Sequence, residues 1–261
     1  MLRALWLYRG FIFGSVEREF RARYLGSLLG AAWAILNPLA MILIYTIIFA
    51  QVMKARLPGV ESVFGYSIYL VSGLLPWTLF AEILGRSHSV FIDNGNLIKK
   101  SSFPRVSLPT IAVISAGLNF SIVFVLFLGF LMVTGNFPGL VVAAVLPVLL
   151  IQITFASGLG ILLGTLNVFF RDIGQMIGVV LQFWFWLTPI IYPMEIIPER
   201  FRWVLALNPL TPLITAYHDI FLRQQMPQWE SLVPVMLISA CVAWFGLAVF
   251  RRNAGELVDE L

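Results

Sequence analysis

Six long apolar stretches separated by short polar segments are the feature that most constrains how this chain can fold. They cover residues 28–52, 68–84, 108–133, 140–169, 173–191 and 232–250. A helix needs about 20 mostly apolar residues to cross a bilayer. Only 11% of the 261 residues are charged, against about a quarter in a soluble domain. The sequence therefore predicts an all-α polytopic membrane protein with six transmembrane helices.

The distribution of lysine and arginine predicts how these helices are oriented. If the N-terminus lies inside, twelve of the 17 basic residues fall in cytoplasmic segments and five in outer ones. Positive residues concentrate on the cytoplasmic side of membrane proteins, so both termini are expected in the cytoplasm. The net charge of +4 arises at the ends of the spans and gives no reason to expect nucleic-acid binding.

Residues 1–27 are too charged to cross the membrane and predict an amphipathic helix at its cytoplasmic interface. Glu17 with Arg21, and Glu19 with Arg23, are expected to pair along this helix because they lie four residues apart. The segment serves either as an anchor that sets the topology or as a mobile element beside a transport path. No cleavage site follows its interrupted apolar run, so it is expected to be retained. Its apolar residues at helical spacing are Phe13, Val16, Phe20 and Tyr24.

A polar, partly basic segment at residues 86–105 lies between the second and third apolar stretches. It carries Arg86, Lys99, Lys100 and Arg105, which place it on the cytoplasmic side. We expect a short surface helix whose apolar face is bound by a soluble partner. The apolar residues at roughly helical spacing are Val90, Phe91, Ile92, Leu97 and Ile98.

Residues 194–229 predict a pair of short helices at the outer face. Four prolines divide the segment into two apolar pieces, at about residues 200–207 and 212–222, and each piece is too short to span. Non-helical backbone near membrane depth persists only where protein or water satisfies its polar groups. A re-entrant or lid-like pair of half-helices is therefore expected.

Enzymatic and ion-coupled functions find little support in the sequence. The phosphate-binding pattern GxxxxGK[ST] is absent, as are the HExxH and CxxC spacings. Glu82 is the main charge within a span and lies near its inner end beside Arg86, whereas ion-driven pumps carry carboxylates in mid-span. His88 is expected in a solvated loop and His218 on a helix surface at the opposite face. A multi-span enzyme would have to draw on Glu195, Glu199, His218 and Asp219.

Aromatic side chains supply a possible transport path. Trp184, Trp186 and Tyr192 lie at the outer end of the fifth stretch, and Trp77 and Phe80 lie in the second. One interpretation is an aromatic belt with ordinary helix packing. The other is a path lined by flat aromatic faces, along which the C–H faces of sugar rings would slide.

Several short motifs resemble, in the same order, the membrane subunits of type-2 ABC exporters for polysaccharides. These subunits are the permeases for O-antigen, teichoic acid and capsule, and the chain looks most like the O-antigen permease. The motifs are REFRARY at residues 18–24, followed by Ser27, Leu29-Gly30, Trp33 and Pro38, then GLLPW at 73–77, NGNLIK at 94–99, FPR at 103–105, FRDI at 170–173, PIIY at 189–192 and NPL at 208–210.

The resemblance implies a permease domain at residues 28–261 that works as a homodimer above two copies of a separate cytoplasmic ATPase. ATP and Mg²⁺ would be held by that ATPase, so this chain would bind no cofactor and catalyse no reaction. The segment at 86–105 would be a coupling helix that fits a groove on the ATPase, and the segment at 194–229 would be an outer gate. The residues in contact with the ATPase would be Asn94, Leu97, Ile98, Lys99, Arg171 and Asp172.

The implied substrate is a polysaccharide linked to undecaprenyl diphosphate, moved from the cytoplasm across the bacterial inner membrane. Arg18, Arg21 and Arg23 would receive the diphosphate at the inner rim, because guanidinium forks match phosphate oxygens. A purely topogenic role for these arginines is an equal alternative. Teichoic acid, capsule or a smaller lipid or drug are alternative cargoes. The lack of a charged channel favours a neutral glycan such as an O-antigen.

Overall fold

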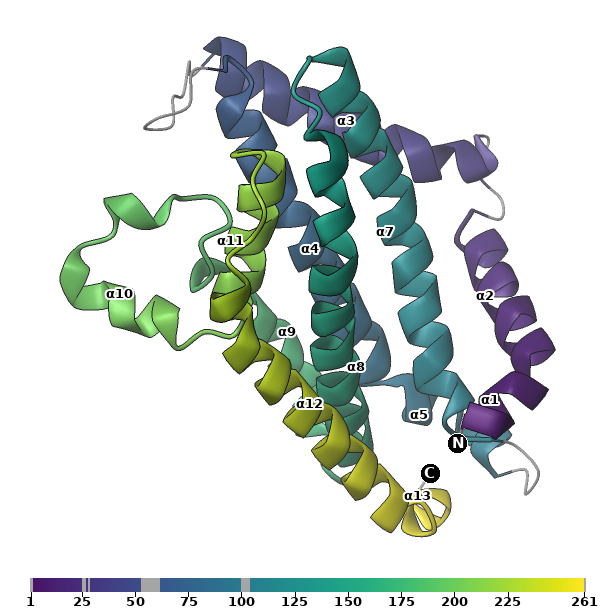
Figure 1. The fold of residues 1–261 in the computed structure, drawn as a ribbon. Coiled ribbons are helices and arrows are strands. Elements are labelled where there is room, and N and C mark those ends of the chain that lie inside the picture. Colours follow the sequence, from purple (N-terminus) through teal and green to yellow (C-terminus); the bar gives the residue numbers. More distant parts are fainter. Residues whose placement is uncertain (1, 25–26, 28, 53–61, 100–103, 261) are drawn as a thin grey trace.

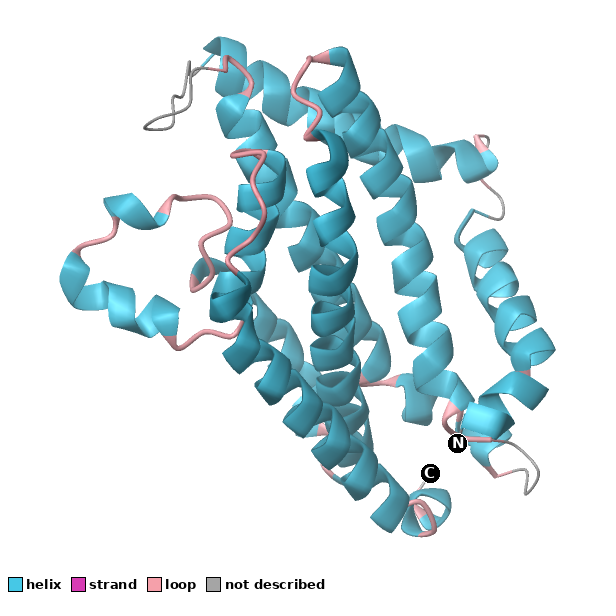
Figure 2. Ribbon diagram, viewed as in Figure 1, coloured by secondary structure: helices cyan, strands magenta, loops and turns pink. Residues whose placement is uncertain are grey.

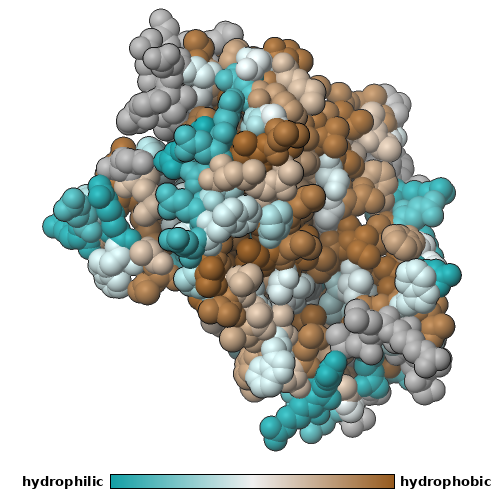
Figure 3. All heavy atoms as spheres, in the orientation of Figure 1, coloured by the Kyte–Doolittle hydropathy of each residue, from teal (hydrophilic) through white to brown (hydrophobic). Residues whose placement is uncertain are grey.

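The computed structural model describes residues 2–24, 27, 29–52, 62–99 and 104–260, and these are all helix or loop, without a strand (Figure 2). Five helices are long and apolar enough to cross a membrane, which confirms five of the six predicted stretches. Apolar side chains cover much of the face shown in Figure 3, and hydrophilic ones gather towards its edges. The five helical segments are Gly30–Phe49, Gly65–Ser87, Ser107–Val133, Gly139–Phe169 and Trp229–Arg252.

The remaining apolar stretch, the fifth along the chain, forms a shorter helix. Helix α9 runs from Asp172 to Trp186, only 15 residues, or about 22 Å at 1.5 Å per residue. The chain then turns at Thr188-Pro189. A hydrocarbon core is about 30 Å thick, so the structure does not establish α9 as a sixth complete span.

The elements follow one another from a short N-terminal pair of helices to a short C-terminal one (Figure 1). They are α1 Leu2–Leu7, α2 Arg9–Tyr24, η1 Gly30–Ala32, α3 Trp33–Thr46, η2 Ile47–Val52, α4 Gly65–Ser87, α5 Val90–Asp93, α6 Gly95–Ile98, α7 Ser107–Val133, η3 Gly139–Ala144, α8 Val145–Phe169, α9 Asp172–Trp186, η4 Met194–Ile196, α10 Glu199–Ala206, α11 Leu210–Phe221, α12 Trp229–Arg252 and α13 Glu256–Asp259.

Helix α4 lies at the centre of the bundle and packs against α7, α8 and α11 (Figure 1). Its most apolar stretch is 72% buried, whereas that of the segment containing α3 is only 11% buried. The side chains of Phe80 and Ile83 on α4 are fully enclosed. Helix α4 is therefore the core of the protomer, and α3 is a peripheral helix that contributes Ile42 to the core and leaves most of its other apolar residues exposed.

Close backbone contacts join α8 to its two neighbours. A Cβ atom on Gly164 would lie 2.4 Å from the carbonyl oxygen of Ser87 on α4, and one on Gly160 would lie 2.7 Å from the Ser87 Cβ atom. On the other side, a Cβ atom on Gly246 of α12 would lie 2.4 Å from the carbonyl oxygen of Gly158. Glycine at these positions thus allows the helices to approach closely.

A buried chain of polar groups ties α4, α8 and α11 together. The Nε2 atom of Gln152 donates to the carbonyl oxygen of Pro76 over 2.6 Å, and the Tyr217 hydroxyl donates to the Oε1 atom of Gln152 over 2.9 Å. All of these groups lie in the apolar core. Because an unpaired polar group is costly there, the chain helps to fix α11 against α4 and α8.

The outer segment contains the two predicted short helices. Helix α10 projects away from the bundle in Figure 1, whereas ten of the residues of α11 are buried against the core. The sequence placed these pieces within one or two residues of their observed limits. A re-entrant path through the membrane stays a prediction.

Candidate functional site

The segment at residues 86–105, which we call the coupling loop, contains α5 and α6. Asn94 lies between these helices, and its Nδ2 atom donates to the carbonyl oxygen of Val90 over 2.9 Å. The backbone N–H of Leu97 in turn donates to the carbonyl oxygen of Asn94 over 2.9 Å. Lys100 falls outside the described residues. The expected short helical element is present, and Asn94 fixes its bend.

Much of the apolar face of the coupling loop is buried inside the protomer. Phe91 is fully buried and stacks on Phe250 of α12, with 5.3 Å between ring centroids. Ile98 is also buried in this cluster. The expectation that Ile98 contacts a partner is wrong for this structure, because α12 and its neighbours already enclose that side chain. Leu97 is half-buried.

A different face of the coupling loop remains exposed. Four residues of the loop, spaced one or three positions apart, are all exposed: Ile92, Asp93, Asn96 and Lys99. They form a mixed apolar and charged surface, which we call the loop face. Lys99 is the one member of this face that was also predicted to contact an ATPase.

The Arg171–Asp172 turn lies next to the coupling loop and is joined to it by Asn167. The Nδ2 atom of Asn167 donates to the carbonyl oxygen of His88 over 2.8 Å, and its Oδ1 atom accepts from the backbone N–H of Gly174 over 2.8 Å. Arg171 and Asp172 are exposed. The two predicted contact sites therefore adjoin one another. The sequence carried no signal for Asn167 beyond a polar residue near a helix end.

His88 is less solvated than expected. The residue is half-buried, and its ring lies over the start of α9. A Cβ atom on Gly174 would lie 3.5 Å from the ring. Its Nδ1 atom lies 3.2 Å from the carbonyl oxygen of Leu84. His88 thus contributes to the junction between the coupling loop and the Arg171–Asp172 turn.

Helix α2 packs lengthwise against the N-terminal half of α7 (Figure 1). Ile12 and Val16 are buried against Ile111. One turn further along, the Ser115 hydroxyl donates to Glu19 over 2.8 Å. Phe13, which was expected on the apolar face, is instead 62% exposed. The helix is thus fixed to a spanning helix, and its placement in the membrane interface stays a prediction.

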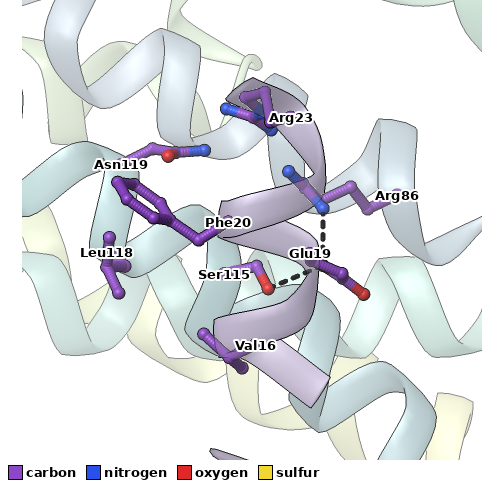
Figure 4. A pocket seen from close by; sticks show the side chains of 8 residues that line it. All are labelled: Val16, Glu19, Phe20, Arg23, Arg86, Ser115, Leu118 and Asn119. Atoms are coloured by element: carbon purple, nitrogen blue, oxygen red, sulfur yellow. Dashed lines mark hydrogen bonds and ion pairs between the residues drawn. The ribbon is translucent and has the colours of Figure 1, made fainter. Parts of the chain in front are cut away.

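Ion pairs on α2 follow the predicted pattern only in part. Arg21 pairs with Glu17 at 2.5 Å, as expected. The expected pair of Glu19 with Arg23 is wrong, because Glu19 accepts from Arg86 on α4 over 3.0 Å (Figure 4). Glu19 thus pairs with the half-buried Arg86, and Arg23 pairs with Glu82 on α4 instead.

Glu82 is the centre of the resulting network. Its Oε1 atom accepts from Arg23 over 3.2 Å, from the Nε atom of Arg86 over 2.9 Å and from the Nδ2 atom of Asn119 over 2.6 Å. We call Glu19, Arg23, Glu82 and Arg86 the ionic network. It joins α2 to α4, and its two carboxylates also accept from Ser115 and Asn119 of α7. A partly buried carboxylate is stabilised by such charge-assisted donors.

The three arginines predicted at the inner rim do not converge. Arg18 donates to the Ser15 hydroxyl over 2.8 Å and lies over the Phe11 ring, and Arg21 is occupied by Glu17. Arg23 alone faces the bundle, where it joins the ionic network.

The aromatic residues predicted to line a path divide into two groups. Phe80 is fully buried between Phe155, with ring centroids 5.8 Å apart, and Trp184, with centroids 5.2 Å apart. Trp77 is buried as well, near Phe185. These side chains pack the protomer core and are not exposed to a path.

Trp186 differs from that group because 57% of it is exposed. Tyr192 is half-buried and donates its hydroxyl to the carbonyl oxygen of Trp186. The exposed face of α9 that ends at Trp186 also carries Gln175 and Gln182, seven residues apart. The sequence analysis missed these glutamines, although two amides on one face of an apolar helix were a readable signal.

Asn208, in the NPL motif, fixes the outer end of α9. Its Oδ1 atom accepts from Trp184 Nε1 over 2.8 Å and from the backbone N–H of Leu210 over 3.0 Å. Its Nδ2 atom donates to the Leu187 carbonyl over 3.0 Å and to the Thr188 hydroxyl over 2.9 Å. Both polar atoms of the Asn208 side chain are thus hydrogen-bonded, and the side chain links α9 to α11.

The turn after α9 is further held by α4. The hydroxyl of Tyr69 donates to the carbonyl oxygen of Tyr192 over 2.7 Å, and that of Tyr66 donates to the carbonyl oxygen of Ile191 over 2.7 Å. Tyr69 also stacks on His218, with 3.9 Å between ring centroids. The expected surface position of His218 is therefore wrong, since the ring is buried between α11 and α4.

Residues that an enzyme would need are engaged separately. Asp219 pairs with Arg223 at 2.7 Å, Glu199 lies on α10 within 3.8 Å of Arg202, and His218 is buried against Tyr69. The Glu195 side chain lies outside the described residues. Within the described parts of the chain, no group of three His, Cys, Asp or Glu side chains is arranged to hold a metal ion.

The chain is similar in sequence to known proteins along most of its length. The family described as "ABC-2 type transporter" matches residues 12–222. The "O-antigen export system permease protein RfbA" of Myxococcus xanthus is 34% identical over 263 residues, covering 100% of this chain and 99% of that protein. The protein of the same description from Klebsiella pneumoniae is 33% identical and covers 90% and 89%.

A more distant relative is the "Polysialic acid transport protein KpsM" of Escherichia coli, 23% identical over 93% of both chains. These relatives are transport proteins that match almost from end to end, and the described residues of this chain include five helices able to cross a membrane. It is thus a multi-pass protein of the bacterial inner membrane, and it belongs to the ABC-2 type transporter family.

Proposed function

We propose that this chain is the permease subunit of an ATP-driven exporter that moves a lipid-linked polysaccharide, of the O-antigen kind, out of the cytoplasm. The observation that carries the proposal is the adjoining position of the coupling loop and the Arg171–Asp172 turn, joined by Asn167. Names of full-length relatives at 33 and 34% identity support the cargo class. ATP and Mg²⁺ would be bound by a separate ATPase, and this chain would catalyse no reaction.

The ATPase would dock on the loop face and on Arg171 and Asp172. These side chains are exposed and carry both charges, as expected of a surface that meets a soluble protein. Asn94 and Leu97 would act from just behind this surface. Behind them, the stacking of Phe91 on Phe250 links the docking surface to α12, so a push on the loop would reach the spans.

The path would be formed between two copies of the chain that face each other through α9. Gln175 and Gln182 are exposed on an apolar helix, and neither side chain makes a hydrogen bond to another described residue. Polar side chains within membrane proteins usually face a partner or a water-filled cavity. Together with Trp186 they would offer amides and an indole face, which suit the hydroxyls and C–H faces of a neutral sugar. With a second copy in place, α9 would complete a sixth span.

The lipid diphosphate would be received on the inner side, where Arg23 is the arginine that faces the bundle. Arg18 and Arg21 would meet lipid phosphates nearer the surface. An acidic capsule polymer is the alternative cargo that the polysialic acid relative favours. The uncharged exposed face of α9, from Gln175 to Trp186, favours a neutral glycan instead.

The test is affinity purification of the full-length chain, coexpressed with the ATPase from its own gene cluster, alongside export measured in a deletion strain. Lys99→Glu should reduce ATPase recovery and cause glycan to accumulate inside the cell. Arg252→Glu, an exposed charge reversal at the end of α12, is the matched control and should leave both unchanged. Normal export by the Lys99→Glu variant would refute the docking surface, and a deletion strain without glycan accumulation would refute the cargo.

A further inference from the structure

A cavity of about 440 Å³ lies between α2, α3 and α7, beside the ionic network. This volume falls within the range of small-molecule sites, about 300–1,000 Å³. Its walls combine an apolar surface with a small number of polar groups. The polar and aromatic residues that line it are Arg23, Ser27, Trp33, Asn37 and Asn119.

Two of these side chains are held in place by Glu82. Arg23 and Asn119 each donate to its Oε1 atom, over 3.2 and 2.6 Å, and both also line the cavity. A guanidinium group has five N–H donors, so Arg23 retains donors for a ligand while Glu82 fixes its position. The Oδ1 atom of Asn119 remains able to accept a hydrogen bond.

The opposite wall is provided by α3. Trp33 and Asn37 lie one turn apart on this helix, and both are exposed. The Asn37 side chain makes no hydrogen bond to another described residue, although its helix is apolar enough to cross a membrane. An amide in such a helix normally faces a polar partner. An indole face with an amide one turn away can hold a sugar ring and one of its hydroxyls.

We propose that this cavity binds the sugar that is attached to the lipid diphosphate. The lipid phosphate would lie at Arg23. The hydroxyls of the sugar would lie at Asn37 and Asn119, and the sugar ring would lie on Trp33. The inference rests on the proposed function and adds that the permease recognises the first sugar together with the phosphate. An ordinary phospholipid shares the phosphate but has no ring for Trp33, so the two ligand sources can be told apart.

The experiment measures lipid binding to the full-length protein in phosphatidylcholine nanodiscs. The probes are undecaprenyl diphosphate and the same lipid carrying one N-acetylhexosamine. The sugar should increase affinity about tenfold, the effect expected of one stacking contact or hydrogen bond. Trp33→Leu and Asn37→Leu should each remove most of this advantage and leave binding of the bare lipid unchanged. Trp244→Leu, at a 73% exposed tryptophan on α12, should preserve it.

The proposal fails if the wild-type protein binds both probes equally, or if the two α3 variants keep the advantage of the sugar. It also fails if phosphatidylglycerol displaces the glycosylated probe as readily as the bare one, because the cavity would then take ordinary headgroups. Those results would leave the exporter function standing. A protein that bound neither probe would overturn both proposals.

Discussion

The Nη1 atom of Arg86 lies 3.0 Å from the Oε2 atom of Glu19, although 67 residues separate them in the chain. Arg86 is in the last turn of α4 and is the first residue of the coupling loop, and Glu19 is on α2. The pair therefore joins the N-terminal helix to the end of α4 that would receive the ATPase. A displacement of the coupling loop would therefore be transmitted to α2 directly through this ion pair at the end of α4.

Replacing the central carboxylate of the ionic network should cost more stability than replacing a surface one. Glu82→Leu leaves the donors of Arg23, Arg86 and Asn119 without their acceptor, and we expect a loss of about 1–3 kcal/mol. Glu17→Leu breaks only an exposed pair within one helix, worth about 0.3–0.5 kcal/mol. Thermal unfolding of the purified variants measures both, and equal melting temperatures would refute the central role of Glu82.

Neighbouring positions in the coupling loop should behave in opposite ways. Phe91→Ala removes a fully buried ring from its stack on Phe250 and should cost about 3–5 kcal/mol. Ile92→Ala, at an exposed position, should change stability by about 0.5 kcal/mol or less but reduce recovery of the ATPase. The readouts are the melting temperature and the copurified ATPase. If Ile92→Ala destabilised the protein as much as Phe91→Ala, the assignment of the two faces would be wrong.

A methyl group at Gly164 should disrupt the contact between α4 and α8. The added Cβ atom would lie 2.4 Å from the Ser87 carbonyl oxygen, and overpacking of this kind costs about 1–3 kcal/mol. Gly117→Ala is the matched control on α7, because no atom lies within 4 Å of the added Cβ. That variant should be neutral or slightly stabilising. Both are checked by the melting temperature, and an unaffected Gly164→Ala variant would contradict the close contact.

Asn208 should be hard to replace even by a residue of its own shape. Asn208→Asp loses the donors to the Leu187 carbonyl and the Thr188 hydroxyl and should cost about 1–3 kcal/mol. Asn136→Asp, in the exposed turn after α7, should cost less, because it affects one local bond to Thr134. Limited proteolysis of the segment at 194–229 would report the difference, and equal cleavage of both variants would exclude a role for Asn208 in holding α9 to α11.

The sequence predicted the helical elements better than the faces they present. Apolar stretches and prolines were sufficient for the five long helices, the coupling loop and the two pieces of the outer segment, because length and hydropathy are properties of one helix alone. Hydropathy did not predict that α9 is short, because its apolar stretch continues past Trp186 while the backbone turns.

Side-chain roles were predicted less well because they depend on contacts between distant segments. Ile98, Trp77 and Phe80 had the composition of a contact surface or a path, but side chains of α8, α9 and α12 enclose them. Glu19 and Arg23 had the spacing of a local pair, but Arg86 and Glu82 compete for them. Such competition cannot be resolved until the helices are placed side by side.

The backbone-to-backbone contact of Gly164 with Ser87 has a mechanical consequence. Where no side chains separate two helices, there is no layer of flexible atoms to accommodate sliding, so we expect α4 and α8 to move as a single rigid body. Alternation between inward-open and outward-open forms would then have to occur along the unenclosed surfaces of α3 and α9. Variation in which polymer is carried would be tolerated on those surfaces and not at the rigid pair.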